Sequence, residues 1–172
     1  MLHSSISQAI CRDNVRNMNI RLYQASDLDE LKRITIEGFE GIAIDQSVEK
    51  ALGILSGHDW RWRKARHVDE DVQANPSGVF VAEEFGKVLG YISTRVDYDS
   101  GRGRIPNLAV DQSVRGRGIG RLLIEHALDY FRRAGMSFAM IETMDNNPVG
   151  QHLYPSCGFV ETCRQIHFAK KL

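Results

Sequence analysis

The chain has 172 residues, enough for one domain with a sizeable core, and its 42% hydrophobic and 26% charged residues are ordinary for a globular protein. Lys plus Arg and Asp plus Glu both number 22, so the formal net charge is zero. This balance argues against a general nucleic-acid binder, which carries a basic excess. The three cysteines form no C-x-x-C pair, which argues against a disulfide framework or a structural zinc site.

The sequence also predicts which part of the chain is ordered and where in the cell the protein is located. Residues 1–17 lack the continuous apolar core of a secretory signal and are expected to form a disordered extension. Residues 18–172 are expected to form a single domain, since Met18 precedes the first convincing strand. No stretch approaches the length of a membrane span, and the cysteine usage favours a reducing cytosol. We therefore expect a cytoplasmic protein with no membrane partner.

The first half of the domain is expected to contain strands and helices in alternation. Apolar residues at helical spacing follow a cap at Ser26 or Asp27, and an apolar run precedes a Phe-Gly-Lys turn. The expected elements, in chain order, are a strand at 20–23, a helix after Asp27, a helical region at 46–55, a charged stretch at 60–72 and a hairpin of strands 79–84 and 88–96.

The most informative pattern lies where a strand gives way to a helix. A strand expected at 104–110 leads into a loop with three alternate glycines, Gly116, Gly118 and Gly120, and then into a helix with apolar residues at helical spacing. At such a junction, free backbone N–H groups and the helix dipole favour an anion, and glycine allows close approach. Positive charge is added by Arg115, Arg117 and Arg121. The pattern predicts a pyrophosphate cradle.

The spacing of the glycines limits which pyrophosphate is bound. A nucleotide-triphosphate loop would end in Gly-Lys-Ser/Thr, which is absent, and G-x-G-x-x-G fails because Arg121 stands in place of its last glycine. The motif R-x-x-G-x-G does fit, from Arg115 to Gly120, and it resembles the acyl-CoA-binding motif of the GNAT superfamily of N-acetyltransferases. Two other interpretations are a glycine-rich turn without chemical consequence and an RNA-binding Arg-Gly segment. The second is disfavoured because this loop leads straight into an amphipathic helix.

A second stretch about thirty residues on strengthens this resemblance. After a strand expected at 138–143, Asn147 is suited to cap a helix and Pro148 to be its first residue. The segment is similar to the family's asparagine-led helix, which ends in Leu-Tyr and is followed by Gly-Phe and a strand. Here Tyr154 is followed by Pro155, which is expected to end the helix. Final strands are expected near Phe159 and at 165–169.

The resemblance implies an α/β (α+β) fold with a mixed, mostly antiparallel twisted sheet of about seven strands and about four helices on both faces. It implies that acyl-CoA lies where the fourth and fifth strands, 104–111 and 138–143, splay apart. Backbone groups of Leu108 and Val110 would pair with the pantetheine arm, and the Val110 N–H would polarise the thioester carbonyl. Backbone N–H groups from Arg115 to Arg121, including Ile119, would hold the pyrophosphate, and Asn147 would contact the pantetheine arm.

The resemblance also implies which residues do the chemistry. Tyr154 matches the family's tyrosine that donates a proton to the leaving thiolate, with a packing role as the alternative. The general base is open: Glu83, Glu84 and Glu142 are candidates, and each is otherwise a solvated surface carboxylate. Because Glu83 and Glu84 are adjacent on a strand, at most one faces the cleft. His126, His152 and Cys157 are expected to be packing or surface residues.

The reaction implied is transfer of an acetyl group from acetyl-CoA, as cosubstrate and without a metal, to a primary amine that attacks directly in a ternary complex. The acceptor, a small molecule or a protein amine, is not named by the sequence. The acidic run 69–71 would suit a cationic amine, whereas Arg61, Arg63, Lys64 and Arg66 would suit an anionic one. One of Trp60 and Trp62 is expected to pack. A homodimer is possible. The rival functions are a non-catalytic acyl-CoA sensor and, less favoured, an RNA-binding protein.

Overall fold

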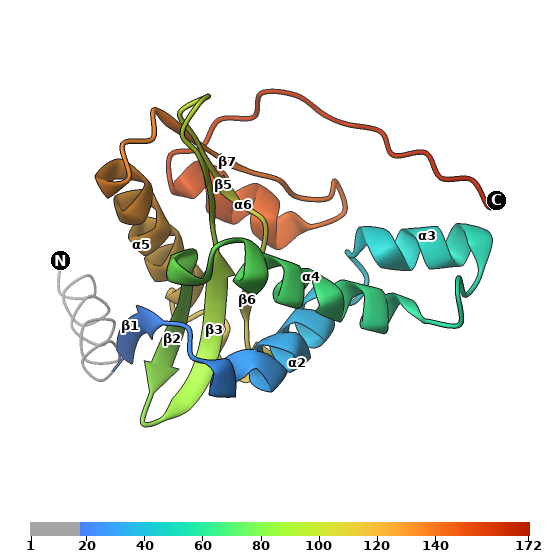
Figure 1. The fold of residues 1–172 in the computed structure, drawn as a ribbon, viewed down its shortest axis with the longest axis horizontal. Coiled ribbons are helices and arrows are strands. Elements are labelled where there is room, and N and C mark those ends of the chain that lie inside the picture. The colour runs from blue at the N-terminus through green and yellow to red at the C-terminus, as the bar shows by residue number, and fades with distance from the viewer. Residues whose placement is uncertain (1–17) are drawn as a thin grey trace, which may run out of the picture.

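The strands of the computed structural model, which describes residues 18–172, form two sheets (Figure 1). The extension expected at 1–17 lies outside the described residues. The larger sheet has the order β1-β2-β3-β6 and is antiparallel throughout. The smaller has the order β4-β5-β7, in which only β5 and β7 are parallel. The strands are β1 (Met18–Leu22), β2 (Val79–Glu84), β3 (Lys87–Ser93), β4 (Arg95–Asp97), β5 (Arg102–Ile105), β6 (Leu108–Val110) and β7 (Phe138–Ile141).

Helices cover both faces of the larger sheet, so the expected mixed α/β fold is confirmed, with five helices in the described part of the chain where about four were expected. α2 and α4 pack on one face, α5 covers the other, and α3 lies outside them against α4 (Figure 1). The helices are α2 (Leu28–Phe39), α3 (Ile44–Leu52), α4 (Trp60–Ala74), α5 (Ile119–Arg133) and α6 (Pro148–Ser156), with short 3-10 turns η1 (Ala25–Asp27), η2 (Pro76–Gly78) and η3 (Gln112–Val114).

The core is divided by β2, which is buried on both faces. Val79 and Val81 pack with Leu31 of α2 and Val68 of α4, whereas Phe80 and its neighbour Ala82 pack against α5. Because a strand that is covered on both faces needs apolar residues at every position, residues 79–82 contain no polar residue. The buried apolar residues of α5 are Ile119, Leu123, Ile124, Ala127 and Phe131.

The expectation of one continuous strand at 104–110 is wrong. β5 ends at Ile105 and β6 begins at Leu108, and the two belong to different sheets. Pro106 lies at the break, where proline supplies no N–H for a ladder. β5 stays beside β7 while β6 pairs with β3, so the two sheets separate at this point. This separation is the splay that the resemblance implied.

The two strands expected near Phe159 and at 165–169 are also absent. Residues 157–172 contain no strand, and residues 160–172 are all exposed. The alternating pattern favours an extended conformation, but a strand also needs a neighbour with which to pair, and this segment has none within the described chain.

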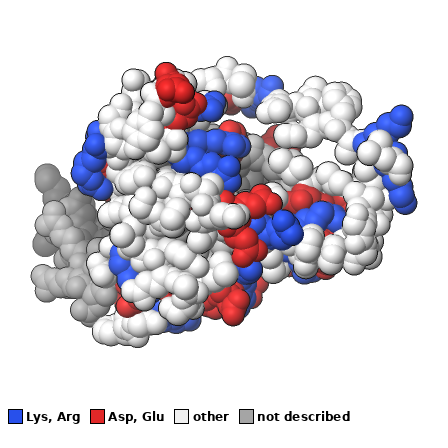
Figure 2. Space-filling view, viewed as in Figure 1, with Lys and Arg blue, Asp and Glu red and all other residues white. Residues whose placement is uncertain are grey.

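Charged side chains of both signs are interleaved on the face shown in Figure 2, over α4 and its neighbours. They include the ion pairs Lys32–Asp69, Arg61–Glu40 and Arg63–Glu49. This face therefore carries no continuous basic surface. Within residues 18–172, no helix is long and apolar enough to cross a membrane.

Candidate functional site

The open edge of β6 is the first component of the site. Asn107 accepts a hydrogen bond from the Ser93 N–H at 2.9 Å, and the Asp111 N–H donates to Leu89 at 2.9 Å, so these residues direct their backbone groups towards β3. Since backbone groups alternate in direction along a strand, those of Leu108 and Val110 face the other way. β6 is the last strand of its sheet, and no other described strand pairs with that edge. An extended ligand could therefore pair there as an added strand.

The glycine loop continues directly from this edge. Gly116 and Gly118 have φ values of +81° and +79°, which glycine adopts without strain, and a Cβ built on either would meet no atom within 4 Å. Gly118 caps α5, whose first-turn N–H groups have no acceptor within the helix. The loop therefore combines open space, free donors and the positive end of a helix dipole. These features fit a pyrophosphate.

The three arginines of the loop do not gather around one point. Arg117 makes a two-pronged contact with Glu84 of β2 at 3.0 and 2.7 Å, and Arg121 donates to the carbonyl and hydroxyl of Ser156, both at 2.8 Å. Both side chains thus attach the start of α5 to its neighbours. Arg115 is exposed and reaches towards Gly38 of α2. We therefore expect the backbone N–H groups of the loop, more than the arginine side chains, to hold the anion.

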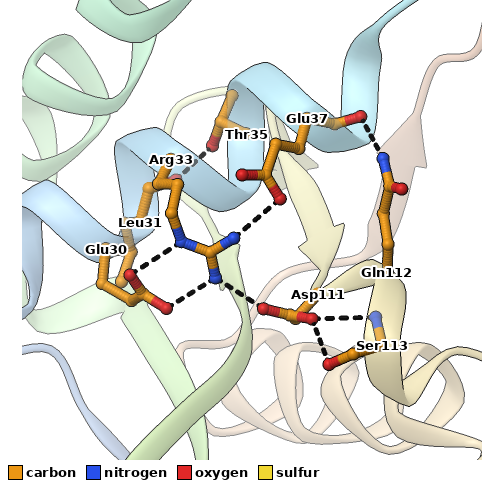
Figure 3. Close-up of polar contacts among 8 residues, drawn as sticks. All are labelled: Glu30, Leu31, Arg33, Thr35, Glu37, Asp111, Gln112 and Ser113. Carbon is orange, nitrogen blue, oxygen red and sulfur yellow. Dashed lines mark hydrogen bonds and ion pairs between the residues drawn. The ribbon is translucent and has the colours of Figure 1, made fainter.

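A cluster around Arg33 fixes the start of the loop (Figure 3). Arg33 of α2 donates to Glu30, to Glu37 and, at 2.5 Å, to Asp111, which immediately follows β6. The other carboxylate oxygen of Asp111 accepts from the hydroxyl and N–H of Ser113 in η3. The Ser113 hydroxyl and the Arg33 guanidinium hold the pKa of Asp111 well below its usual range. The cluster therefore stays charged at neutral pH and ties α2 to the start of the glycine loop.

Tyr154 is held by the way α6 ends. The Gly158 N–H donates to the Pro155 carbonyl at 3.0 Å and the Phe159 N–H to the Tyr154 carbonyl at 3.1 Å, with φ of Gly158 at +90°. This is a Schellman closure, and the Phe159 ring packs on the Tyr154 ring, as expected of such a motif. The Gly-Phe pair therefore orients Tyr154. The expectation that α6 ends before Pro155 is wrong: it continues to Ser156, because a proline in the last turn removes only one helical hydrogen bond.

The environment of Tyr154 makes its phenol harder to ionise. Burial and, secondly, the negative charge of Glu142 raise the pKa of Tyr154 to about 12. The phenol therefore keeps its proton at neutral pH. Tyr154, on α6, is therefore within electrostatic range of Glu142, which follows β7.

The three candidate carboxylates occupy different places, and Glu84 is the one already described in contact with Arg117. Glu142 follows β7 directly, is exposed and pairs with Arg104 of β5 at 3.1 Å. Glu83 lies on β2 and pairs with Arg21 of β1 at 2.5 Å. β3 separates β2 from β6 in the sheet. Of Glu142 and Glu83, only Glu142 lies close enough for its charge to act on Tyr154.

Asn147 and Gly120 bring α6 close to the rest of the site. The Asn147 side chain caps α6 by accepting from the Gly150 N–H at 3.2 Å, and it donates to Thr143 at 2.9 Å. Asn147 is therefore engaged in holding the turn between β7 and α6. A Cβ on Gly120 would lie 3.2 Å from Leu153 and 3.9 Å from Val110, so α5, α6 and β6 converge at this glycine.

Sequence reasoning missed a buried polar network at the point where the sheets separate. Asp71 of α4, 2% exposed, accepts from Ser93 at 2.5 Å, from Asn107 at 2.7 Å and from Arg95 at 2.9 Å. Lys64 donates to the Asn107 side chain at 2.7 Å. Within the run 69–71, Asp71 is therefore a buried structural residue. The sequence signal that could have found it is the polar pair Ser93 and Asn107 at the ends of apolar strands.

The remaining candidates lie where packing explains them. Trp60 is 3% exposed, which confirms that one tryptophan packs in the core, while Trp62 is 42% exposed and stacks on His58. His126 contacts the Phe80 ring, and burial lowers the pKa of His126. Cys157 packs against the core. Among residues 18–172, no three His, Cys, Asp or Glu side chains are placed to hold a metal ion.

The open strand edge, the glycine loop and the splayed sheets define an α/β protein whose geometry fits an extended, phosphate-bearing ligand between strands. Residues 42–159 match the model of the acetyltransferase (GNAT) family. The chain therefore belongs to the GNAT family of acetyltransferases.

Individual relatives agree with this assignment. A mycothiol acetyltransferase of Thermomonospora curvata is 31% identical over 100 residues, or 58% of this chain, but the match spans only 33% of that relative's length. An uncharacterized N-acetyltransferase of Methanocaldococcus jannaschii is 29% identical over 143 residues, covering 83% of this chain and 78% of that protein. The PaiA N-acetyltransferase of Thermoplasma acidophilum, solved in complex with coenzyme A, has a TM-score of 0.64 at 17% identity, covering 81% of this chain and 87% of that one. This last likeness shows a shared fold.

Proposed function

We propose that the protein is an N-acetyltransferase that transfers an acetyl group from acetyl-CoA to a primary amine by direct attack in a ternary complex. The observation that carries the proposal is the open edge of β6, which leads through the short turn η3 into the glycine loop. An acyl-CoA has a matching order of groups: an extended pantetheine arm with amide groups, followed by a pyrophosphate. Acetyl-CoA supplies a reactive thioester carbonyl when it is bound.

The chain's own residues would hold this cosubstrate mainly through the backbone. Leu108 and Val110 would pair with the pantetheine amides, and the Val110 N–H would polarise the thioester carbonyl. The N–H groups from Arg115 to Arg121 would bind the pyrophosphate. Asn147 caps α6 with its side chain and would contact the pantetheine arm from that turn.

Proton transfer is the part of the chemistry that needs side chains. An alkylamine with a pKa near 10.4 is neutral in roughly one molecule in a few thousand at pH 7, so a base must remove a proton before attack. We assign that role to Glu142, directly or through water, in preference to Glu83, because Glu142 directly follows β7 and its charge acts on Tyr154, whereas Glu83 lies on β2 and pairs with Arg21. Tyr154 would protonate the departing thiolate. Comparison of Glu142→Gln with Glu83→Gln tests the choice, since only the first should lower turnover at neutral pH.

The proposed reaction defines the acceptor only by its chemical class, a primary amine. A polyamine, an amino acid, an amine antibiotic and a protein amine all fit that description. The relatives do not select one of these amines, because the match to the mycothiol acetyltransferase covers only 33% of that relative's length.

The first test is a calorimetric titration with acetyl-CoA, followed by an assay for released thiol over a panel of these amines. Binding with thiol release on one amine class would support the enzyme and identify its substrate type. Binding without release on any amine would favour the alternative, a non-catalytic acyl-CoA sensor. Absence of binding would contradict the interpretation of the glycine loop.

A further inference from the structure

Lys64 of α4 carries a buried ammonium group that has no ion-pair partner within the described chain. The residue is 7% exposed, and its Nζ donates a hydrogen bond to the Asn107 side chain at 2.7 Å. The centroid of the Phe39 ring, at the end of α2, lies 3.8 Å from the same Nζ. An ammonium has three N–H donors, and a buried lysine is almost always paired with an opposite charge. Lys64 therefore has unused capacity to bind an anion.

The acidic residues that act on Lys64 are held by other cations. Their carboxylates are those of Asp45 in α3 and Asp71 in α4. Asp45 pairs with Arg63 at 3.9 Å, and Asp71 pairs with Arg95 at 2.9 Å. Burial outweighs both negative charges and lowers the pKa of Lys64 to about 8, so the group is mostly protonated at neutral pH. An anion in direct contact with Nζ would therefore stabilise this charge.

The position of Lys64 relates it to the acceptor rather than to the cofactor. Asn107, which Lys64 contacts, directly precedes Leu108, the first residue of β6. Lys64 belongs to α4, which packs on the face of the larger sheet opposite to α5. The glycine loop leads into α5, so the proposed cofactor enters from that side. In a ternary complex the amine must reach the thioester from the side that the cofactor leaves free, and we expect this to be the side of α2 and α4.

A carboxylate on the acceptor fits this position better than a second cation does. A carboxylate carries one negative charge and accepts hydrogen bonds from an ammonium, so it matches a single lysine. A polyamine would instead bring further positive charge towards Lys64, and the two like charges would repel. Because Lys64 contacts the residue before Leu108, a carboxylate held by Nζ leaves its amine a short distance from the proposed thioester. A short amino carboxylate therefore satisfies both requirements.

We propose that the acceptor is an amino acid or a similarly short amino carboxylate, whose carboxylate is bound by Lys64 while its amine attacks the thioester. The inference rests on the proposed function and narrows its acceptor class, which the sequence left open between cationic and anionic amines. The reaction is unaltered: the amine nitrogen bonds to the acetyl carbon, the C–S bond breaks, the base takes the proton of the amine and the thiolate is protonated. Lys64 is thus a specificity-determining residue.

Matched acceptor pairs test the inference on the wild-type protein. Thiol release from acetyl-CoA is measured with L-alanine and ethylamine, L-leucine and 3-methylbutylamine, and 4-aminobutyrate and propylamine, whose members differ only in the carboxylate. In at least one pair the amino acid should have a kcat/KM roughly 10- to 100-fold higher, the range expected for a buried hydrogen bond to a charged group. Equal values in all pairs, or a preference for spermidine over every amino acid, would overturn the inference and leave the acetyltransferase activity established.

The variant Lys64→Met tests the residue itself. Methionine keeps the length of the side chain and removes the charge, so the ratio of kcat/KM between the amino acid and its matched amine should fall to about one. A structural role of Lys64 would lower both values and leave the ratio as it is in the wild type, which would contradict the assignment. Lys50→Met is the matched control, because Lys50 is an exposed lysine of α3, and it should keep the wild-type ratio.

A binding measurement separates failure of this inference from failure of the proposed function. Calorimetric titration with each amino acid and its matched amine is carried out in the presence of coenzyme A, which has no acetyl group to transfer. The wild type should bind at least one amino acid at least about tenfold more tightly than its matched amine, and Lys64→Met should not. Absence of thiol release with every amine would contradict the proposed function alone. Equal binding within every pair would reject the carboxylate site of Lys64.

Discussion

Arg33 and Asp111, 78 positions apart in the sequence, are joined by a hydrogen bond of 2.5 Å between the guanidinium Nη2 and the carboxylate Oδ2. Asp111 is 6% exposed and stands between β6 and the glycine loop, and it also holds Ser113 at the start of η3. Arg33 is fixed in turn by Glu30 and Glu37 on its own helix (Figure 3). Helix α2 therefore positions the loop that is proposed to bind pyrophosphate.

We expect Arg33→Gln to raise the KM for acetyl-CoA about tenfold, which corresponds to about 1.4 kcal/mol of binding free energy. Without the guanidinium, Asp111 keeps only its Ser113 contacts, and the loop is less well ordered before the cofactor binds. The change should leave kcat nearly unaltered, because Arg33 touches no reacting group. Steady-state kinetics at varied acetyl-CoA concentration would measure both quantities.

Arg132→Gln provides the control for this variant. Arg132 pairs with Asp129 on the exposed end of α5, so its loss removes one guanidinium without touching the loop. Equal effects of the two variants on KM would show that Arg33 has no special role in positioning the loop.

Substitution of Gly118 separates backbone strain from obstruction of the cofactor. Gly118 and Gly53 have φ values of +79° and +78°, and a Cβ on either meets nothing within 4 Å. Valine at either position should therefore cost a similar 1–2 kcal/mol of stability, roughly the strain of a left-handed residue. Only Gly118→Val should weaken acetyl-CoA binding, by at least about tenfold, because its side chain occupies the proposed pyrophosphate space. Unaltered affinity, measured by calorimetry, would remove that assignment.

Proline substitutions test the open edge of β6. Val110→Pro removes an N–H that faces away from β3, whereas Ala109→Pro removes one that faces β3 within the ladder. We expect Val110→Pro to lower turnover about 10²–10³-fold, as for the loss of one oxyanion donor, with a smaller fall in Tm than Ala109→Pro. Full turnover in folded Val110→Pro would show that this N–H does not polarise the thioester.

Local signals in the sequence were sufficient for much of this arrangement. Gly118 marks the start of α5 because a left-handed cap and an apolar periodicity coincide there, and the apolar run 79–82 marks a strand buried on both faces. Tyr154 was found through the family resemblance of the segment from Asn147 to Phe159, and its Gly-Phe pair forms the helix closure that orients the tyrosine. In each case the residues that determine the feature lie within a few positions of one another.

Features that depend on distant partners were not accessible in this way. No local pattern shows that Arg117 is paired with Glu84, or that Asp71 is buried against Asn107. The break between β5 and β6 was signalled by Pro106, but which sheet each half joins depends on β3 and β7. The pattern at 165–169 favours a strand, yet a strand forms only where an edge receives it.

Tyr154→Phe tests the proton donor. Loss of the hydroxyl should lower kcat about 10²–10⁴-fold, the usual contribution of a positioned acid, and should leave acetyl-CoA affinity within about twofold. Because the pKa of Tyr154 is raised to about 12, wild-type activity should show no alkaline fall from this group below that pH. Tyr98→Phe, at a tyrosine that is 72% exposed, is the control. Equal turnover in Tyr154→Phe and the wild type would leave Tyr154 with a packing role alone.

The buried Lys64 makes the free energy of unfolding depend on pH. Burial lowers the pKa of Lys64 from 10.5 to about 8, against the opposing charges of Asp45 and Asp71. Between pH 8 and about 10.5 the unfolded chain therefore binds more protons than the folded one, so the free energy of unfolding contributed by this group rises with pH. Relative to Lys64→Met, the wild type should gain up to about 3 kcal/mol over that interval. Urea unfolding of both proteins at pH 8 and pH 10 measures the difference, and a constant offset between them would show that Lys64 keeps its ordinary pKa in the folded protein.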